Sequence, residues 1–362
     1  MSVEKIHVRG EAYAFRSFFV SANGQRIHCI EGGEGPVVLF VHGFPESWYL
    51  WRYQMVDVIK EGYRAVAISP RGFGRSSKPR DYAAYRITEL AKDIAQVVRA
   101  LGQDKVYLVG HDWGATTAWT AAWLYPEYFH GVVGISNAFD GANVSALPFD
   151  PENKKSASQV WQEWGNEERM YYQEYFANVD LAESEMMSDA RSWLFNAYWG
   201  WSGLPKLPAV LEGIDRLNMT DEQIRDVLRQ TSIFKNRAKP NNPVKKLDVP
   251  SPEWLNEEDL DYVADAYNAS GFYGGLNYYK AMDLDWELLR YKEDVRITIP
   301  CMYIGSDRDW VVLWSRDALR RLPDRCDDLR GITILKDTGH WQEIERHDEV
   351  SGEILKFLKS FR

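Results

Sequence analysis

The stretch Gly110-His111-Asp112-Trp113-Gly114 lies between two runs of different character. Val106 to Val109 form a short apolar run that predicts a buried strand, and Ala115 to Leu124 predict a helix. A strand, a tight Gly-x-x-x-Gly turn and a helix are typical of a nucleophile elbow, which exposes its central side chain above the carboxyl edge of a sheet. The alternative is an ordinary strand-to-helix turn, in which Asp112 only caps the helix.

The composition is that of a globular protein with a surplus of aromatic residues. Of 362 residues, 45% are hydrophobic and 27% charged, which suffices for a large core plus an inserted layer, or for two domains. Aromatic residues reach 14%, and such a surplus either lines an apolar pocket or fills the core. The net charge of −10 predicts no basic face, and therefore no nucleic-acid partner.

The cysteines and the N-terminal stretch of the sequence predict the cellular compartment of the protein. Cys29, Cys301 and Cys326 are scattered, odd in number and without metal-ligand spacing, which predicts a reducing, cytoplasmic compartment. The mixed, charged stretch Met1 to Arg16 predicts no signal peptide. No apolar run approaches the length of a membrane span, so we expect none.

A second strand-to-loop transition occurs near the start of the chain. Pro36 to Val41 is continuously apolar, as expected for a strand buried on both faces, and leads into His42-Gly43-Phe44-Pro45-Glu46. In a fold with a nucleophile elbow, the loop after this strand donates one backbone N–H to an oxyanion hole. The N–H of Phe44 is the candidate donor, and a plain Gly-Pro turn is the alternative.

Turn chemistry and periodicity predict the other elements of this half: a hairpin around Asn23-Gly24, a strand over Arg64 to Ile68, and helices over Ser47 to Ile59 and Thr88 to Leu101. The glycine-rich loop Pro70 to Ser77 could be taken for a phosphate cradle. It lacks the Gly-Lys-Ser/Thr ending and opens no apolar helix. We therefore expect a structural turn that packs beside the active site.

The spacing of apolar residues changes in the middle of the chain. From about Asn137 to about Glu293 no clear buried strand occurs, and the pattern instead favours helices over Ala190 to Trp201, Asp221 to Gln230, Glu257 to Ala269 and Leu276 to Tyr291. We predict a helical cap domain, or lid, over residues 138–293. It interrupts a core domain formed by residues 1–137 and 294–362.

The last part of the chain again predicts strands of the sheet. A strand over Ile299 to Gly305 is followed by Ser306-Asp307-Arg308-Asp309-Trp310, and a strand over Ile332 to Leu335 is followed by Thr338-Gly339-His340-Trp341. Alternating strands and helices with buried strands predict an α/β fold with a mostly parallel, twisted sheet flanked by helices. The order nucleophile, acid, histidine is the one expected when Asp112 occupies the elbow.

The carboxylate of Asp112 can do chemistry that a serine cannot. It is ionised at neutral pH, its reference pKa being about 3.9, and the helix N-terminus at Trp113 favours the anion. It can displace a leaving group at a saturated carbon and form an ester of its own side chain. His340, oriented by an acid, would then activate water to attack the Asp112 carbonyl carbon, with the N–H groups of Phe44 and Trp113 as the oxyanion hole.

The leaving group separates two classes of substrate. A halide leaves without a proton and is held by indole N–H donors. An epoxide oxygen leaves as a basic alkoxide and needs an acid, and tyrosine, with a pKa near 10, can donate at neutral pH.

The chain resembles the epoxide hydrolases of the α/β-hydrolase superfamily, in particular soluble bacterial members. The motifs that carry the resemblance are His42-Gly43-Phe44-Pro45-Glu46-Ser47-Trp48, Gly110-His111-Asp112-Trp113-Gly114-Ala115 and Gly339-His340-Trp341. It extends from about Phe18 to the C-terminus. Dehalogenases share part of the first two motifs.

The resemblance implies two lid tyrosines that hold the epoxide oxygen. Tyr172 matches the first and Tyr279 the second, with Tyr175 and Tyr278 as the nearby alternatives. The acid of the family matches Asp309, with Asp307 as the alternative. One departure is Ser69, where relatives often carry an acid, and we expect it to affect loop packing rather than mechanism.

We therefore predict an epoxide hydrolase, a hydrolase acting on ether bonds, whose partner is a small epoxide and which needs no cofactor or metal. A homodimer is left open. The first alternative is a haloalkane dehalogenase: Trp113 suits halide binding, although Phe44 lacks the polar side chain that often assists it. The second is a catalytically silent binding protein of the same fold, against which the intact Asp, His and acid set argues.

Overall fold

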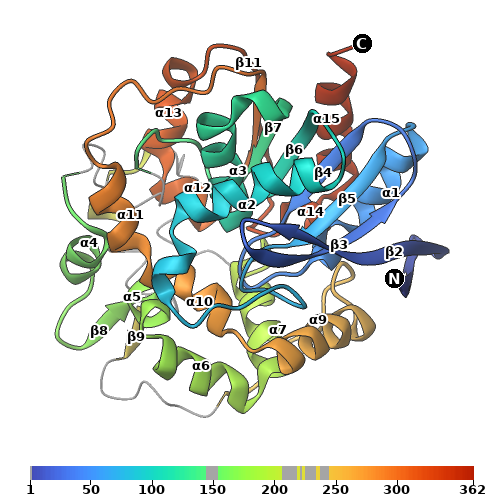
Figure 1. Cartoon of the computed structure of the whole chain (residues 1–362). Helices are drawn as coiled ribbons and strands as arrows, with labels where there is room; N and C mark the ends of the chain where they lie inside the picture. The colour runs from blue at the N-terminus through green and yellow to red at the C-terminus, as the bar shows by residue number, and fades with distance from the viewer. Residues whose placement is uncertain (1, 144–153, 206–217, 221, 225–233, 237–243) are drawn as a thin grey trace.

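The computed structural model describes residues 2–143, 154–205, 218–220, 222–224, 234–236 and 244–362. A large sheet with helices on both faces forms the core, and a layer of helices covers one edge of it (Figure 1). The predicted α/β-hydrolase architecture is confirmed.

The strands of the core form one nine-stranded sheet in the described part of the chain, in the order β1-β2-β3-β5-β4-β6-β7-β10-β11. The pairs from β5 to β11 are parallel, whereas β1, β2 and β3 join antiparallel. The predicted hairpin at Asn23-Gly24 is the β2–β3 connection. The strands are β1 Ser2–Val8, β2 Glu11–Ala22, β3 Gln25–Gly32, β4 Val37–Val41, β5 Arg64–Ser69, β6 Val106–His111, β7 Phe129–Ile135, β10 Cys301–Ser306 and β11 Leu329–Leu335.

Helices cover both faces of the parallel strands, which explains why these strands are continuously apolar. The core helices are α1 Arg52–Lys60, α2 Ile87–Ala100, α3 Trp113–Leu124, α12 Trp310–Trp314, α13 Arg316–Arg325, α14 Gln342–Glu345 and α15 His347–Lys359. In β4, Val37, Leu39 and Val41 belong to a hydrophobic cluster that includes side chains of α2, α3 and α13, while Val38 and Phe40 belong to a cluster that includes side chains of α1, α15 and the lid.

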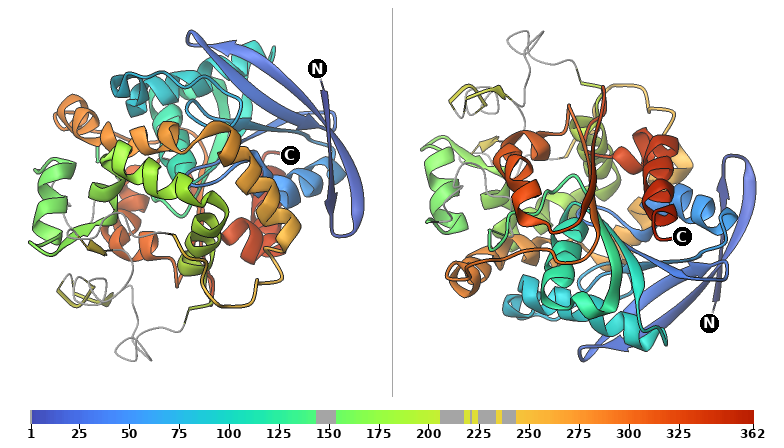
Figure 2. Two further views of the ribbon diagram at one scale, coloured as in Figure 1. Left: turned by 90° about the horizontal axis from the view of Figure 1, so that it is seen from below. Right: turned by 90° about the horizontal axis from the view of Figure 1, so that it is seen from above.

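The segment between β7 and β10 forms the lid. Seen from below, in the left panel of Figure 2, its helices lie in front of the sheet. Its aromatic side chains join the same hydrophobic cluster as Phe44 and Trp113 of the core, which fixes the lid on the site. The lid elements are α4 Ala157–Trp164, β8 Arg169–Tyr171, α5 Tyr172–Ala177, α6 Val179–Ser188, α7 Ala190–Trp201, β9 Phe234–Asn236, α9 Glu257–Ser270, α10 Tyr273–Lys280 and α11 Met282–Leu289.

Three details differ from the sequence-based expectations. The helix expected over Leu276 to Tyr291 is two helices, α10 and α11, that meet at Ala281. Trp48–Trp51 is a 3-10 helix, and α1 starts only at Arg52; the Ser47 side chain caps the 3-10 helix by accepting the N–H of Tyr49. Strand β1 was not predicted, because its exposed, polar composition carries little strand signal.

The helix expected over Asp221 to Gln230 lies mostly outside the described residues. The domain boundaries remain a prediction. Among the helices that the structure describes, none combines the length and apolar character needed to cross a bilayer.

Candidate active site

The backbone around Asp112 has the geometry of a nucleophile elbow. Asp112 lies between the end of β6 at His111 and the start of α3 at Trp113, with φ 53° and ψ −124°, a conformation that non-glycine residues adopt only where the surrounding structure enforces it. A Cβ at Gly110 would overlap the carbonyl oxygen of Gly114, and a Cβ at Gly114 would overlap that of Val41. Both glycines are therefore required for the close approach of strand, turn and helix.

The carboxylate of Asp112 faces the loop after β4. The backbone N–H of Phe44 donates to Asp112 Oδ1 at 2.8 Å. Gly43 must be glycine, because a Cβ there would overlap the same oxygen. Trp113 opens α3, so its N–H has no partner within the helix and lies at the positive end of the helix dipole.

The pKa of Asp112 differs from the reference value of about 3.9 that the sequence analysis assumed, although the group is an anion at neutral pH as expected. Burial raises the pKa of this carboxyl to about 6, against the opposing effects of His340 and of the N–H of Phe44. The group is still mainly ionised at neutral pH. It becomes protonated in mildly acidic solution, where a free aspartate would keep its charge.

His340, from the loop after β11, lies between two carboxylates. Its Nε2 is 3.7 Å from Asp112 Oδ2, and its Nδ1 is 3.1 Å from Asp309 Oδ2. Burial alone would lower the pKa of His340, but the charge of Asp309 and the hydrogen bond to it raise that pKa above 6.5. Asp309 thus orients the ring so that Nε2 points at the elbow.

Asp309 is fully buried and held by several donors. Its carboxylate accepts hydrogen bonds from Ser136 Oγ at 2.6 Å, from the N–H of Val311 at 2.9 Å and from Gln342 Nε2 at 3.1 Å. Burial would raise its pKa, but His340 and these hydrogen bonds lower it, so it stays ionised. Asp307, the alternative from the sequence, lies 3.8 Å from Lys336 Nζ and not against His340.

Two tyrosines from the lid close the site opposite Asp112. Tyr172 opens α5 and Tyr279 lies in α10, with ring centroids 6.2 Å apart. The Tyr279 ring is 5.3 Å from that of Trp113. Burial and the charge of Asp112 raise the pKa of both tyrosines, so their hydroxyls stay protonated.

The neighbouring tyrosines face elsewhere. Tyr278 donates to the carbonyl of Arg71 at 2.8 Å, and burial and the nearby carboxylate of Glu185 raise the pKa of Tyr175. Neither lines the cavity that holds Asp112. The structure thus brings Tyr172 and Tyr279 to the site and leaves Tyr175 and Tyr278 outside it.

The cavity between core and lid is small and mainly apolar. Its volume is ≈ 50 Å³. Apart from Asp112, His340 and the two tyrosine hydroxyls, its polar character is low; the other walls are Phe44, Pro45, Phe176, Trp193, Ala197, Trp201, Val311 and Trp341. The glycine-rich loop packs beside it as predicted, because the ring of Phe73 lies 6.4 Å from that of Phe44.

Glu46, His111 and Glu343, to which the sequence analysis assigned no role, form a buried cluster next to the site. His111 Nδ1 lies 2.8 Å from Glu46 Oε1 and 3.6 Å from Glu343 Oε1, and its Nε2 lies 2.8 Å from the carbonyl oxygen of His340. Glu46 Oε2 accepts the N–H of Gly43 at 2.7 Å. The cluster thus ties the Phe44 loop, the elbow and the His340 loop together.

The ionisable groups of this cluster influence one another. Burial would lower the pKa of His111, but Glu343 and Glu46 raise it well above 6.5. Burial raises the pKa of Glu343 to about 8, against the opposing effect of His111. Glu46, His111 and His340 could by proximity hold a metal ion, but hydrogen bonds already engage both nitrogens of His111. The clue in the sequence was that Glu46 and His111 lie inside the two motifs.

Comparisons with known proteins agree with this geometry. The chain matches the α/β-hydrolase fold family over residues 36–346. It is 36% identical to epoxide hydrolase B of Mycobacterium tuberculosis over 95% of this chain and 98% of that protein. It is 32% identical to an epoxide hydrolase of Caballeronia sordidicola, over 95% and 94%. The solved structure of an epoxide hydrolase from an endophytic Streptomyces has a TM-score of 0.79 at 34% identity, covering 96% of each chain.

Proposed function

The chain belongs to the epoxide hydrolases of the α/β-hydrolase fold, and we propose that it converts an epoxide and water into a vicinal diol through an ester on Asp112. The observation that carries this proposal is the pair of protonated tyrosine hydroxyls in one apolar cavity with an ionised aspartate. A nucleophile and its matching acids thus share the small space in which an epoxide would lie.

In the first half-reaction, Asp112 attacks one ring carbon of the epoxide. A C–O bond of the ring breaks as the ester bond forms, and the oxygen leaves toward Tyr172 and Tyr279. One hydroxyl supplies the proton that converts the alkoxide into an alcohol, and the second donates a hydrogen bond. The raised pKa values keep both groups in the donating form.

In the second half-reaction, neutral His340 removes a proton from a water molecule, which attacks the carbonyl carbon of the ester. The oxyanion forms on Asp112 and is stabilised by the N–H groups of Phe44 and Trp113. Asp309 stabilises the imidazolium. Collapse of the tetrahedral intermediate breaks the ester C–O bond, and the leaving alkoxide takes the proton of the newly formed Asp112 carboxyl to give the diol. The proton on His340 returns to the tyrosinate.

The direct test is to supply styrene oxide and measure diol, with a panel of haloalkanes assayed for halide release in parallel. Diol without halide supports the proposal, and halide without diol would establish the dehalogenase instead. Two tyrosine hydroxyls favour the epoxide, because a halide leaving group needs no proton. A thermal shift on ligand addition with neither product would indicate the silent binding protein.

Replacing either lid tyrosine should slow ring opening. For Tyr172→Phe and for Tyr279→Phe we expect kcat/KM for styrene oxide to fall by roughly 10²-fold, since general acid catalysis typically contributes at least this much. Tyr175→Phe and Tyr278→Phe are matched controls, and should change kcat/KM by less than about threefold. A larger loss in the controls than in the two predicted residues would reverse the assignment.

The raised pKa of Asp112 predicts an acid limit on the first half-reaction. The nucleophile must be deprotonated, so the rate of alkylation should fall as the pH drops below about 6, by about tenfold per pH unit. Stopped-flow measurement of single-turnover alkylation against pH checks this. A rate that stays constant down to the pH where free aspartate protonates would show that the carboxyl is not perturbed.

The wider setting of the enzyme also belongs to the proposal. Three free, buried cysteines support a reducing, cytoplasmic location. The net charge of −10 supports the absence of a nucleic-acid partner. A homodimer remains open, and size-exclusion chromatography with light scattering tests it.

A further inference from the structure

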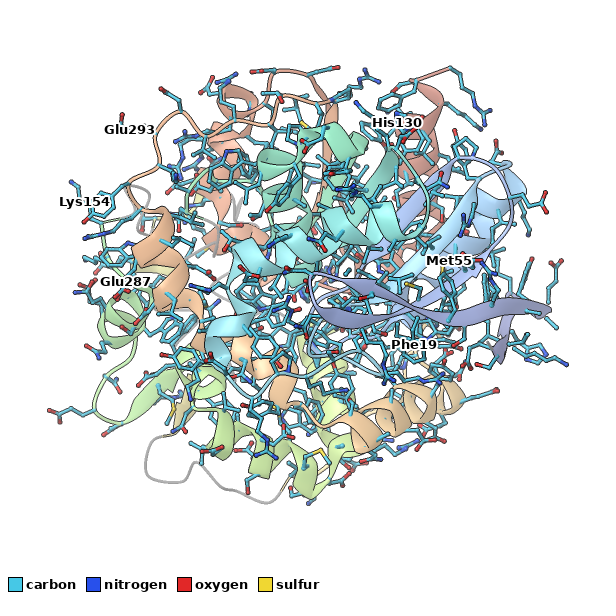
Figure 3. All side chains as sticks on the ribbon, viewed as in Figure 1. Phe19, Met55, His130, Lys154, Glu287 and Glu293 are labelled. Carbon is cyan, nitrogen blue, oxygen red and sulfur yellow. The ribbon has the colours of Figure 1, made fainter. Side chains whose placement is uncertain are left out.

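A second cavity, of ≈ 710 Å³, lies between the strands β1 to β3, the glycine-rich loop after β5, and helix α9 of the lid. It shares no lining residue with the cavity at Asp112 and is far larger. Its volume falls within the range of small-molecule sites, which is about 300–1,000 Å³. Phe19, which lines it, is labelled in Figure 3, where it lies between β2 and α9.

The charged side chains around this second cavity are mainly cationic. Arg26, Arg75 and Lys78 line it together with two carboxylates, Glu4 and Asp265. Arg75 lies 3.8 Å from Glu4, a long ion pair. Within the described residues, neither Arg26 nor Lys78 forms an ion pair with a carboxylate. In a protein of net charge −10, this is a local positive site.

The two arginines are arranged around an aromatic ring. The guanidinium carbons of Arg26 and Arg75 lie 4.5 and 5.2 Å from the ring centroid of Phe19. Such contacts hold a guanidinium in place while its N–H groups remain able to bind a planar carboxylate. Trp48 and Tyr262, with ring centroids 6.0 Å apart, give the cavity an apolar wall.

The cations of this cavity repel one another. His28 is held by Ser17 and Ser69, and burial together with Arg75 and Arg26 lowers its pKa to about 4, so it is neutral. Burial and Arg26 also lower the pKa of Lys78. A bound anion would relieve this repulsion.

We propose that the second cavity binds an organic monocarboxylate whose carboxylate lies between Arg26 and Arg75 and whose apolar body packs on Trp48 and Tyr262. The charge of the ligand follows from the lining, because three cations and two carboxylates leave one positive charge. The apolar body follows from the aromatic wall. This cavity is separate from the one that holds Asp112, so a test of carboxylate binding here does not depend on whether the proposed reaction is correct.

Isothermal titration calorimetry with 3-phenylpropionate tests the proposal, with 3-phenylpropanamide as the uncharged analogue and inorganic phosphate as an anion without an apolar body. We expect one-to-one binding of the carboxylate, at least about tenfold tighter than of either analogue, because charge-assisted bonds to guanidinium are strong. The double variant R26Q/R75Q should weaken it by at least about tenfold. R99Q, on the exposed end of α2, should leave it unchanged.

Three further variants test whether the carboxylate binds in the second cavity. Ala266→Phe, which narrows the cavity from α9 without removing a charge, should also weaken binding. Asp265→Asn should strengthen it by a few-fold, and Asp112→Ala should not affect it. If the amide or phosphate binds as tightly as the carboxylate, if R26Q/R75Q binds normally while folded, or if Asp112→Ala abolishes binding, the proposal is wrong.

Discussion

Asp112→Ala should lower diol formation from styrene oxide by on the order of 10⁴-fold or more, because removing a covalent nucleophile removes the route itself. The elbow holds this side chain at positive φ, with one oxygen on the Phe44 N–H and the other toward His340. Among the groups around the cavity, no second carboxylate faces it in the described residues. Chiral chromatography of the diol measures the loss.

Oxygen labelling then separates the covalent route from direct attack by water. In a single turnover in ¹⁸O-water, the heavy atom should enter the carboxylate of Asp112, and the first diol should carry the unlabelled oxygen of that side chain. Asp307→Asn, two residues before Asp309 but facing Lys336, is the matched control and should turn over normally. Label that goes directly into the first diol would refute the ester.

His340→Gln should separate the two halves of the reaction. Ring opening needs Asp112 and the tyrosines, whereas hydrolysis of the ester needs a base on the water. We therefore expect the alkyl-enzyme to accumulate, with a mass gain equal to that of the substrate on the peptide that contains Asp112. Steady-state turnover should fall by roughly 10³-fold, the usual range for loss of a general base.

His130→Gln provides the control for this variant. His130 is exposed at the amino end of β7, far along the strand from Ser136 and the site, and is labelled in Figure 3. It should show neither adduct nor loss of turnover. If His340→Gln also forms no adduct while it remains folded, as shown by circular dichroism, then His340 acts before or during alkylation, and the assigned role is wrong.

Local sequence patterns were sufficient to predict the elbow, the parallel sheet and the chain order of nucleophile, acid and histidine, whereas the choice of Asp309 as the acid came from the family resemblance. Each of these depends on short-range features: an apolar strand, a glycine turn and the loop that follows. Strand β1, which is mostly exposed, and the break between two lid helices at Ala281 were not predicted, because neither has such a local signal.

The sequence by itself determined that a carboxylate, not a hydroxyl, stands at the elbow, and hence which kind of intermediate can form. Only the tertiary structure decided that Tyr279 rather than Tyr278 lines the cavity, that Asp309 rather than Asp307 contacts His340, and that Arg26 and Arg75 line a second cavity. Consecutive residues of a helix point about 100° apart, so two adjacent tyrosines face different surroundings. Which one faces the site depends on how the whole helix packs against the core, and that packing arises from contacts between residues distant in the chain.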